Sequence, residues 1–342
     1  MGWANPDGGG RVALSLALQT DKTPAEYAQL AQLADRHAFD VVSVYNDLLF
    51  QPALGPLLIM APHLRRAQLG PAALNPYTLH PIEIAGQLAM LDTVTDGRAY
   101  LGLARGAWLD ALGIDARKPL QTLREAVLLV RHLLARRPEA FEGQVFRLAA
   151  GAALRYAPRR SAPPIVLGTW GRRTAALAGE VADEVKMGGS ANPALVPYLR
   201  PAIDEGSRRA GRPGGSVGVC LGAVTVVDEQ RARARARARR EIALYLPVVA
   251  PLDPTLGDPD WLARLAHLAA HGEHAAIADL VTDAILERFA FAGDPDDIIR
   301  QVENLVAAGA TRVEFGTPHG ADDPATGIEL LGTRVLPHFL GA

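Results

Sequence analysis

Short apolar runs alternate with longer amphipathic stretches along the chain, from about residue 12 almost to the end. This alternation predicts a parallel sheet covered by helices, because strand–helix–strand units join parallel neighbours. Eight predicted strands favour a closed barrel over an open sheet. We therefore predict one α/β domain over residues 1–342, folded as a single (β/α)8 (TIM-type) barrel. The predicted strands are 12–18, 40–45, 67–70, 99–103, 165–168, 184–187, 217–227 and 312–315.

The helices between these strands have recognisable starts. Thr23-Pro24-Ala25-Glu26 has the form of a capping box with proline at the first helical position. Asp294-Pro295-Asp296-Asp297 repeats this pattern, and Gly309 is expected to end the helix that follows. Apolar residues at helical spacing between Leu120 and Leu134 predict a helix that faces the barrel.

Two segments interrupt the alternation and are predicted insertions, near 137–164 and 228–290. The first is expected to carry a short hairpin beside the barrel. In the second, arginines alternate with alanines from Arg231 to Arg239 and would surround a helix, which favours a solvated helix over an anion site. His267, His271 and His274 lie in an alanine-rich helix without an HExxH motif, so no metal site is expected.

Composition narrows the functional classes. A hydrophobic content of 49% is enough for a sizeable core, and a net charge of −2 gives no reason to expect nucleic acid or an anionic membrane as a partner. No apolar run reaches the eighteen or so residues of a membrane span. One cysteine, Cys220, excludes an internal disulfide and suits a reducing compartment, so we expect a cytoplasmic protein.

The loops after the predicted strands are the expected place for chemistry, because barrels of this type place their sites at the carboxyl ends of the strands. The sixth strand leads into Gly188, Gly189, Ser190, Ala191 and Asn192-Pro193. Glycines and a helix start in this order predict a phosphate site, with a merely tight turn as the alternative. Gly168 and Thr169 repeat the pattern after the fifth strand, and Trp170 beside them offers a flat face.

Polar side chains follow the other strands. The candidates are Asn46 and Asp47 after the second strand, Asn75 after the third, Arg105 and Trp108 after the fourth, and His319 after the eighth. Histidine titrates in the range that suits proton transfer, although a plain loop histidine is the alternative for His319.

At these loops the chain resembles the luciferase-like flavin and deazaflavin oxidoreductases, most closely the subgroup of the coenzyme F420-dependent methylenetetrahydromethanopterin reductases. The stretches that carry the likeness span nearly the whole chain in one order. They are LGPAALNPYTLHP, GRAYLGLARGAWLDALGI, VLGTWGRRTAALAGEVADEVKMGGSANP and VEFGTPHG.

The resemblance implies a bacterial luciferase-like barrel with the ring of F420 over the strand ends. It also implies a non-proline cis peptide bond near Ala72-Ala73 that supports the ring, with Asn75 at the polar edge of the ring. Asn46-Asp47 matches the polar end of the second strand in this family. Gly168-Thr169 and the loop from Gly188 to Ala191 match its cofactor-phosphate sites. Arg105, Trp108 and Trp170 would border the substrate, and a homodimer is expected by likeness alone.

The chain departs from the family at its usual proton donors. Leu48 stands where several members have histidine, Ala107 stands where F420-dependent members often have an acid, and the first strand carries no acid. The likeness therefore does not extend to methylenetetrahydromethanopterin or glucose 6-phosphate as substrates. We expect F420-dependent hydride transfer to or from another C=N or C=C bond, with Asp47, His319 or a water completing the proton step. An FMN-dependent monooxygenase and a non-catalytic F420- or flavin-binding protein are the alternatives.

Overall fold

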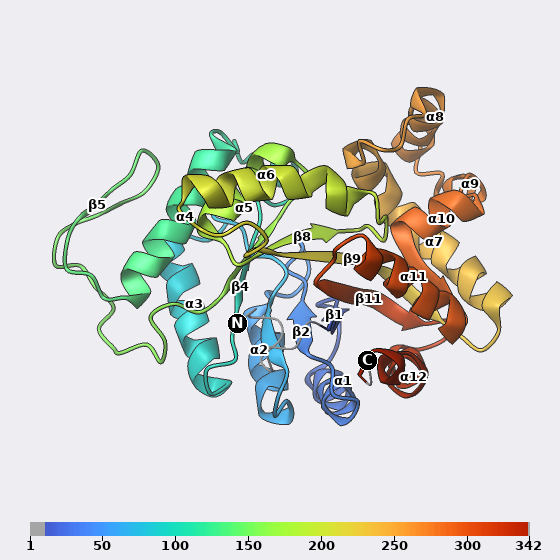
Figure 1. Ribbon diagram of the computed structural model, residues 1–342, viewed down its shortest axis with the longest axis horizontal. Coiled ribbons are helices and arrows are strands. Elements are labelled where there is room, and N and C mark those ends of the chain that lie inside the picture. The colour runs from blue at the N-terminus through green and yellow to red at the C-terminus, as the bar shows by residue number, and fades with distance from the viewer. Residues whose placement is uncertain (1–10, 341–342) are drawn as a thin grey trace.

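The computed structural model describes residues 11–340, and within them eight parallel strands form a barrel (Figure 1). The strands run round the barrel in the order β3-β2-β1-β11-β9-β8-β7-β4. Backbone bridges between Leu69 and Ala99 and between Leu74 and Leu103 bring β3 beside β4 and close the ring. The predicted (β/α)8 barrel is confirmed. Its strands are β1 (Ala13–Leu18), β2 (Val41–Val44), β3 (Gln68–Pro71), β4 (Leu101–Leu103), β7 (Ile165–Gly168), β8 (Glu184–Gly188), β9 (Gly218–Val227) and β11 (Arg312–Gly320).

Helices cover the outside of this barrel. The α-helices outside the two insertions are α1 (Pro24–Arg36), α2 (Leu54–Met60), α3 (Pro81–Val94), α4 (Pro119–Leu134), α5 (Arg172–Val181), α6 (Leu195–Arg209), α11 (Pro295–Ala307), α12 (Pro324–Leu330) and α13 (Leu336–Leu340). No helix within residues 11–340 is long and apolar enough to cross a membrane.

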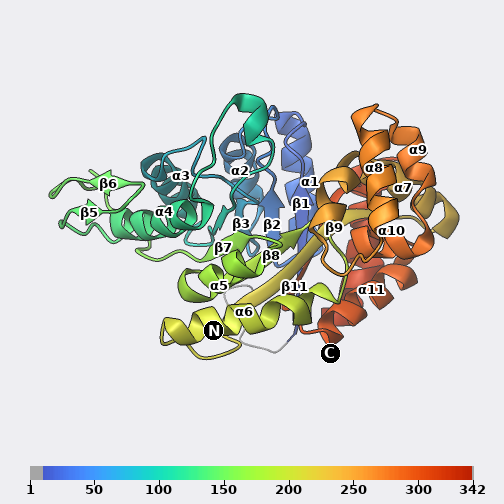
Figure 2. The same ribbon diagram turned by 90° about the horizontal axis from the view of Figure 1, so that it is seen from above.

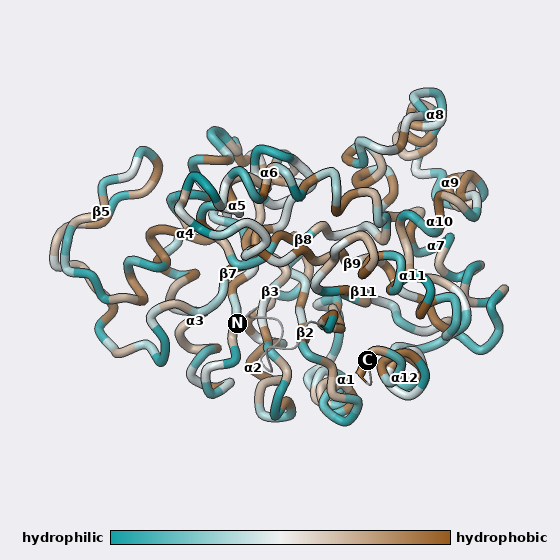
Figure 3. Tube along the Cα trace, in the orientation of Figure 1, coloured by the Kyte–Doolittle hydropathy of each residue, from teal (hydrophilic) through white to brown (hydrophobic). Residues whose placement is uncertain are grey.

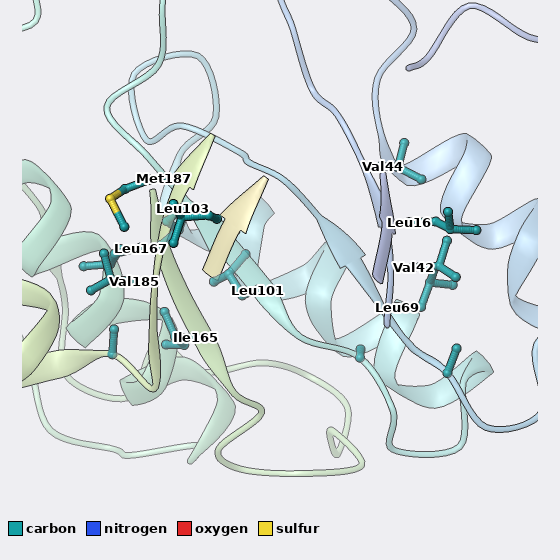
Figure 4. Packing of buried hydrophobic residues seen from close by; sticks show 14 of the residues in the cluster. Leu16, Val42, Val44, Leu69, Leu101, Leu103, Ile165, Leu167, Val185 and Met187 are labelled. Atoms are coloured by element: carbon teal, nitrogen blue, oxygen red, sulfur yellow. The ribbon is translucent and has the colours of Figure 1, made fainter. Parts of the chain in front are cut away.

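The main core lies between the barrel wall and the helices. Strand residues such as Leu16, Val42, Leu103 and Val185 point outward from the barrel into this layer (Figure 4) and are almost completely buried. Apolar positions follow the strands, and polar positions lie along the outer helices (Figure 3). The alternate strand positions point into the barrel, so the interior side chains are a separate set.

Local sequence signals place the helices as predicted. At the start of α1, the side chain of Thr23 accepts from the amide of Glu26, and the Glu26 carboxylate accepts from the amide of Thr23 at 2.7 Å. Asp294 caps α11 by accepting from the amide of Asp297 at 2.9 Å. Each cap satisfies amides that the first helical turn leaves without a partner, which explains why the helices begin there.

The first insertion carries the predicted hairpin, formed by β5 (Phe141–Glu142) and β6 (Arg147–Leu148). Glu125 on α4 holds the turn, because its carboxylate accepts from the amides of Gln144, Val145 and Phe146 at 2.7 to 2.9 Å. The hairpin projects from one end of the molecule (Figure 2).

The second insertion lies at the opposite end (Figures 1 and 2) and is formed by α7 (Arg231–Val249), α8 (Pro259–Ala270), α9 (His274–Asp279) and α10 (Asp283–Phe289). Five arginines of α7 make ion pairs with carboxylates, as Arg231 does with Asp297 at 2.6 Å and Arg235 with Asp283 at 3.0 Å. Four of these pairs connect α7 to other elements, and the pair of Arg237 with Glu241 lies within α7. The pairing favours a structural role of the arginines over an anion site.

One strand was not predicted from the sequence. β10 (Ala290–Gly293) follows α10 directly and pairs in parallel with the last residues of β9. Four small or apolar residues between two helices give no period-two pattern of useful length, so the strand depends on its partner β9.

Candidate active site at the mouth of the barrel

A network of buried charged and polar side chains fills the interior of the barrel. Arg312 donates two hydrogen bonds to the Glu184 carboxylate, from Nε at 3.0 Å and from Nη2 at 2.5 Å. Its Nη1 donates to Glu314 at 2.9 Å. The ammonium of Lys186 donates to the same Glu314 carboxylate. Ser43 donates to Glu314 at 2.5 Å, so the hydroxyl of Tyr100, 2.7 Å from Ser43 Oγ, is the donor of that second bond.

The network is balanced in charge, with two cations and two carboxylates. Burial alone would raise the pKa of Glu314, but Lys186 and Arg312 beside it outweigh burial and lower its pKa. Burial dominates at Glu184 and raises its pKa, although Arg312 opposes this shift. Buried charges persist only where they are paired and hydrogen-bonded, as they are here.

Above this network lies a small central pocket. Two of its lining residues, Ala72 and Ala73, are joined by a cis peptide bond, at the place that the family resemblance implied. Lys186 and Arg312 line the pocket, whereas Glu184 and Glu314 do not. The complete lining is Pro71, Ala72, Ala73, Tyr100, Gly102, Val166, Gly168, Lys186 and Arg312.

Asp47 stands on the loop after β2, half-buried. Its Oδ2 accepts from Nε2 of Gln19 at 2.9 Å, and its charge helps to raise the pKa of Tyr245 on α7, a shift caused first by burial. The side chain of Asn46 does not share this contact with Gln19. Its Oδ1 accepts from the amide of Ala53 at 3.1 Å. Tyr245 of helix α7 therefore lies near the loop after β2, close to the carboxylate of Asp47.

The loop after β8 uses most of its amides within the protein. The amides of Gly189 and Ser190 donate to the carbonyl of Gly222, and the amide of Ala191 donates to the carbonyl of Arg288 at 2.8 Å. Ser190 is fully buried, and its Oγ contacts the Arg288 carbonyl at 3.3 Å. These groups are already hydrogen-bonded within the protein, which favours the alternative of a tight turn over the predicted phosphate site. Gly188 is exposed, and nothing lies within 4 Å of the position that a Cβ would take there.

The loop after β7 lies beside it. Nε1 of Trp170 donates to the Gly188 carbonyl at 3.0 Å and so connects the two loops. The Trp170 ring packs partly against the main core and partly against the apolar cluster of the second insertion. The hydroxyl of Thr169 accepts from the amide of Gly171 at 2.9 Å. Helix α5 starts at the next residue without a side-chain cap, which leaves its first amides for another acceptor.

The remaining candidates occupy the loops after β3 and β4. Asn75 is buried, and its Oδ1 accepts from the amides of Tyr77 and Thr78 at 3.1 and 2.9 Å, so it shapes its own loop. Arg105 is exposed, and Trp108 is 45% exposed with a left-handed backbone. Of the two residues that replace the family's proton donors, Leu48 is half-buried and Ala107 is exposed.

The prediction of a catalytic His319 is not supported. The ring is fully buried, and its Nε2 lies 3.1 Å from the carbonyl of Phe315, which must be the acceptor. Burial lowers the pKa of His319 to about 4, so the ring is neutral near pH 7. A buried neutral imidazole that already donates to the backbone has the character of a packed core histidine, which was the alternative reading.

The interior network of Glu184, Lys186, Arg312 and Glu314 was not predicted from the sequence. Glu184 and Lys186, and likewise Arg312 and Glu314, stand two residues apart within otherwise apolar strands. This period-two placement of charge puts both members on the same face of a strand and was the available signal. Cys220 is buried in the same interior, where burial raises the pKa of its thiol, in agreement with an inert cysteine. No group of three or more His, Cys, Asp or Glu side chains in the described part of the chain is placed to hold a metal ion.

Residues 10–312 match the model of the luciferase-like monooxygenase family, and the chain belongs to this family. The 5,10-methylenetetrahydromethanopterin reductase of Methanopyrus kandleri is 28% identical over 96% of this chain and 99% of the relative. The F420-dependent glucose-6-phosphate dehydrogenase of Nakamurella multipartita is 27% identical over 92% and 93%. The solved structure of the coenzyme F420-dependent tetrahydromethanopterin reductase from Methanopyrus kandleri superimposes with a TM-score of 0.87, at 27% identity, over 96% of this chain and 99% of the other.

Proposed function

We propose that this protein is an F420-dependent oxidoreductase that passes a hydride between the cofactor and a small organic substrate. The observation that carries the proposal is the full-length similarity to F420-dependent enzymes, which spans 96% of this chain and therefore includes the loops at the mouth. The pocket inside that mouth, which two cationic side chains border, supports it, because barrels of this type place their chemistry there.

The residues at the mouth suit a flat ring with a phosphate-bearing tail. Ala72, Ala73 and Gly168 would hold the ring because they line the pocket with little side-chain bulk, and Gly188 borders open space. Asn46 and Asn75 would stand at the polar edge. Bound F420 supplies the hydride, and the protein supplies position and electrostatics. For the phosphate we propose Thr169 and the uncapped first turn of α5 in place of the satisfied amides after β8.

Asp47 is the residue we propose for the proton step. It is half-buried at the mouth, and Gln19 holds one of its oxygens, which fixes the orientation of the carboxyl group. Because Leu48 and Ala107 replace the usual donors, we propose a substrate with a C=N or C=C bond in place of the substrates named for the relatives. Arg105, Trp108 and Trp170 would border that substrate.

A fluorescence titration with F420 and with FMN tests the cofactor first. We expect F420 to bind more tightly than FMN. Reduced F420 should then be reoxidised by imine or enone substrates faster than by air alone. Turnover with reduced FMN alone would contradict the proposal.

Two alternatives have defined signatures in the same assay. The family's description supports an FMN-dependent monooxygenase, which would consume oxygen with reduced FMN. A non-catalytic carrier would bind F420 tightly without turnover of any substrate, whereas the enzyme should lose turnover and keep its F420 affinity in Asp47→Ala. We also propose that the protein is a cytoplasmic homodimer. Light scattering after gel filtration measures its oligomeric state.

A further inference from the structure

Lys186 is a charged side chain in a largely enclosed position. Its side chain is 9% exposed, and it borders the central pocket together with Ala72, Ala73 and Gly168. An ammonium group carries three N–H donors. Within residues 11–340, the hydrogen bond of this ammonium goes to Glu314, and its nitrogen also lies 5.5 Å from the centre of the Tyr45 ring. Lys186 therefore has donor capacity left for a ligand in the pocket.

The charged groups around Lys186 are arranged with their cations, and not their carboxylates, toward the pocket. The groups around the ammonium come from several strands. They are Glu314 and Arg312 on β11, Glu184 on the same strand β8, Cys220 on β9, Tyr100 directly before β4 and Tyr45 directly after β2. The two cations line the pocket, while the two carboxylates do not. Arg312 is fully buried against its carboxylates, whereas Lys186 keeps some exposure. In the ion pair of Lys186 with Glu314, the ammonium therefore lies on the side of the pocket.

The two candidate cofactors differ in how they respond to such a charge. The ring of oxidised F420 carries an acidic hydroxyl, and its deprotonated form spreads negative charge over the ring and its carbonyl edge. The oxidised ring of FMN has no such hydroxyl and stays neutral over the same pH range. A nearby cation favours an anion over its neutral form.

We propose that Lys186 donates a hydrogen bond to the electronegative edge of the ring bound in the mouth, stabilises the anionic form of oxidised F420 and thereby selects F420 over FMN. The inference rests on the proposed function, which names the cofactor. It adds a residue that determines both cofactor choice and the ionisation of the bound ring. Glu314 positions Lys186 from below, and Ser43 and Arg312 hold Glu314 in turn at 2.5 and 2.9 Å.

The test is a pH titration of the visible absorption of bound, oxidised F420 in the wild type, Lys186→Met and Lys186→Arg. Methionine keeps the length of the side chain without its charge, and arginine keeps the charge. In Lys186→Met we expect the titration midpoint to move to higher pH, by roughly tenfold in proton concentration, and F420 to bind about tenfold more weakly near neutral pH. FMN affinity should change by less than about twofold, because its ring is neutral. Lys186→Arg should stay close to the wild type.

A second variant keeps the test decisive if Lys186→Met does not fold. Lys186→Met combined with Glu314→Gln removes one cation and one anion, so Arg312 and Glu184 remain as a balanced pair. We expect this variant to fold and to show a midpoint shift in the same direction. A folded variant without the Lys186 charge that keeps the wild-type midpoint and the wild-type preference for F420 would overturn the inference while the proposed function stands. If the wild type itself does not bind F420, the proposed function fails and the inference fails with it.

Discussion

The guanidinium of Arg312 lies against the carboxylate of Glu184 inside the barrel, with Nε at 3.0 Å and Nη2 at 2.5 Å and both side chains fully buried. The two residues stand 128 positions apart in the chain. A buried pair of this kind gives little net stability by itself, but removing one partner leaves an uncompensated charge in a place that water does not reach.

Arg312→Met is therefore expected to lower the free energy of unfolding by about 3 to 5 kcal/mol, because it leaves Glu184 without its bidentate partner. Chemical denaturation followed by circular dichroism measures this. Arg65→Met is the matched control: Arg65 pairs with Asp35 at 2.7 Å, but its side chain is 82% exposed. The control should cost less than about 1 kcal/mol. Equal losses in the two variants would contradict the structural role of the interior pair.

Gly188 and Gly189 are adjacent, but only Gly188 has space for a side chain. A Cβ at Gly188 meets nothing within 4 Å, while one at Gly189 would lie 2.8 Å from Cγ1 of Val249, on a backbone with φ of 84°. Gly188→Val should keep the free energy of unfolding within about 1 kcal/mol. It should weaken F420 binding by about tenfold, because the side chain enters the space proposed for the ring.

Gly189→Val should instead destabilise the fold by about 1 to 3 kcal/mol, since valine is disfavoured at positive φ. Thermal unfolding and the fluorescence titration separate the two effects. Unchanged F420 affinity in a stable Gly188→Val variant would argue against this part of the mouth as the cofactor site.

Asp47→Asn tests the proton step. The amide keeps the shape of the side chain and its contact with Gln19, but it cannot exchange a proton. We expect kcat to fall by about 100-fold or more while the F420 dissociation constant changes by less than about twofold. Asp21→Asn is a control on a neighbouring loop, where Asp21 is exposed and pairs with Lys22 at 2.5 Å. A similar loss in both variants, or none in Asp47→Asn, would remove Asp47 from the mechanism.

His319 should affect stability and leave the pH profile of turnover unchanged. The ordinary pKa of histidine is 6.5, and burial lowers that of His319 to about 4 in the folded chain. As the pH falls from 6.5 toward 4, the unfolded chain gains a proton that the folded chain does not, so stability is lost by up to about 3 kcal/mol. His319→Asn, which suits the positive φ of 74°, should flatten this loss between pH 7 and 5.

The measurement is the free energy of unfolding as a function of pH in the wild type and the variant, alongside the pH dependence of kcat. A change in the kinetic profile together with an unchanged stability profile would restore His319 as a catalytic candidate.

The sequence alone predicted the barrel, because the relevant signals are local. Period-two and continuous apolar runs placed every strand of the barrel, and caps such as Thr23 and Asp294 placed the helix starts. Glycine- and proline-rich loops after the strands predicted a site at the carboxyl ends of the strands, and the small pocket bordered by Ala72, Ala73 and Gly168 lies beside these loops. The family resemblance placed the cis peptide bond at Ala72-Ala73 and the family itself.

Tertiary structure decided which groups remain available for chemistry. The amides after Gly188 suit a phosphate by local pattern, yet their acceptors are the carbonyls of Gly222 and Arg288, which are distant in the chain. The same holds for His319, whose burial depends on packing around the barrel, and for Lys186, whose partner Glu314 is 128 residues away. A periodic pattern tells which face of a strand a side chain occupies. It does not tell which strand lies opposite, and that partner sets burial, charge and hydrogen bonding.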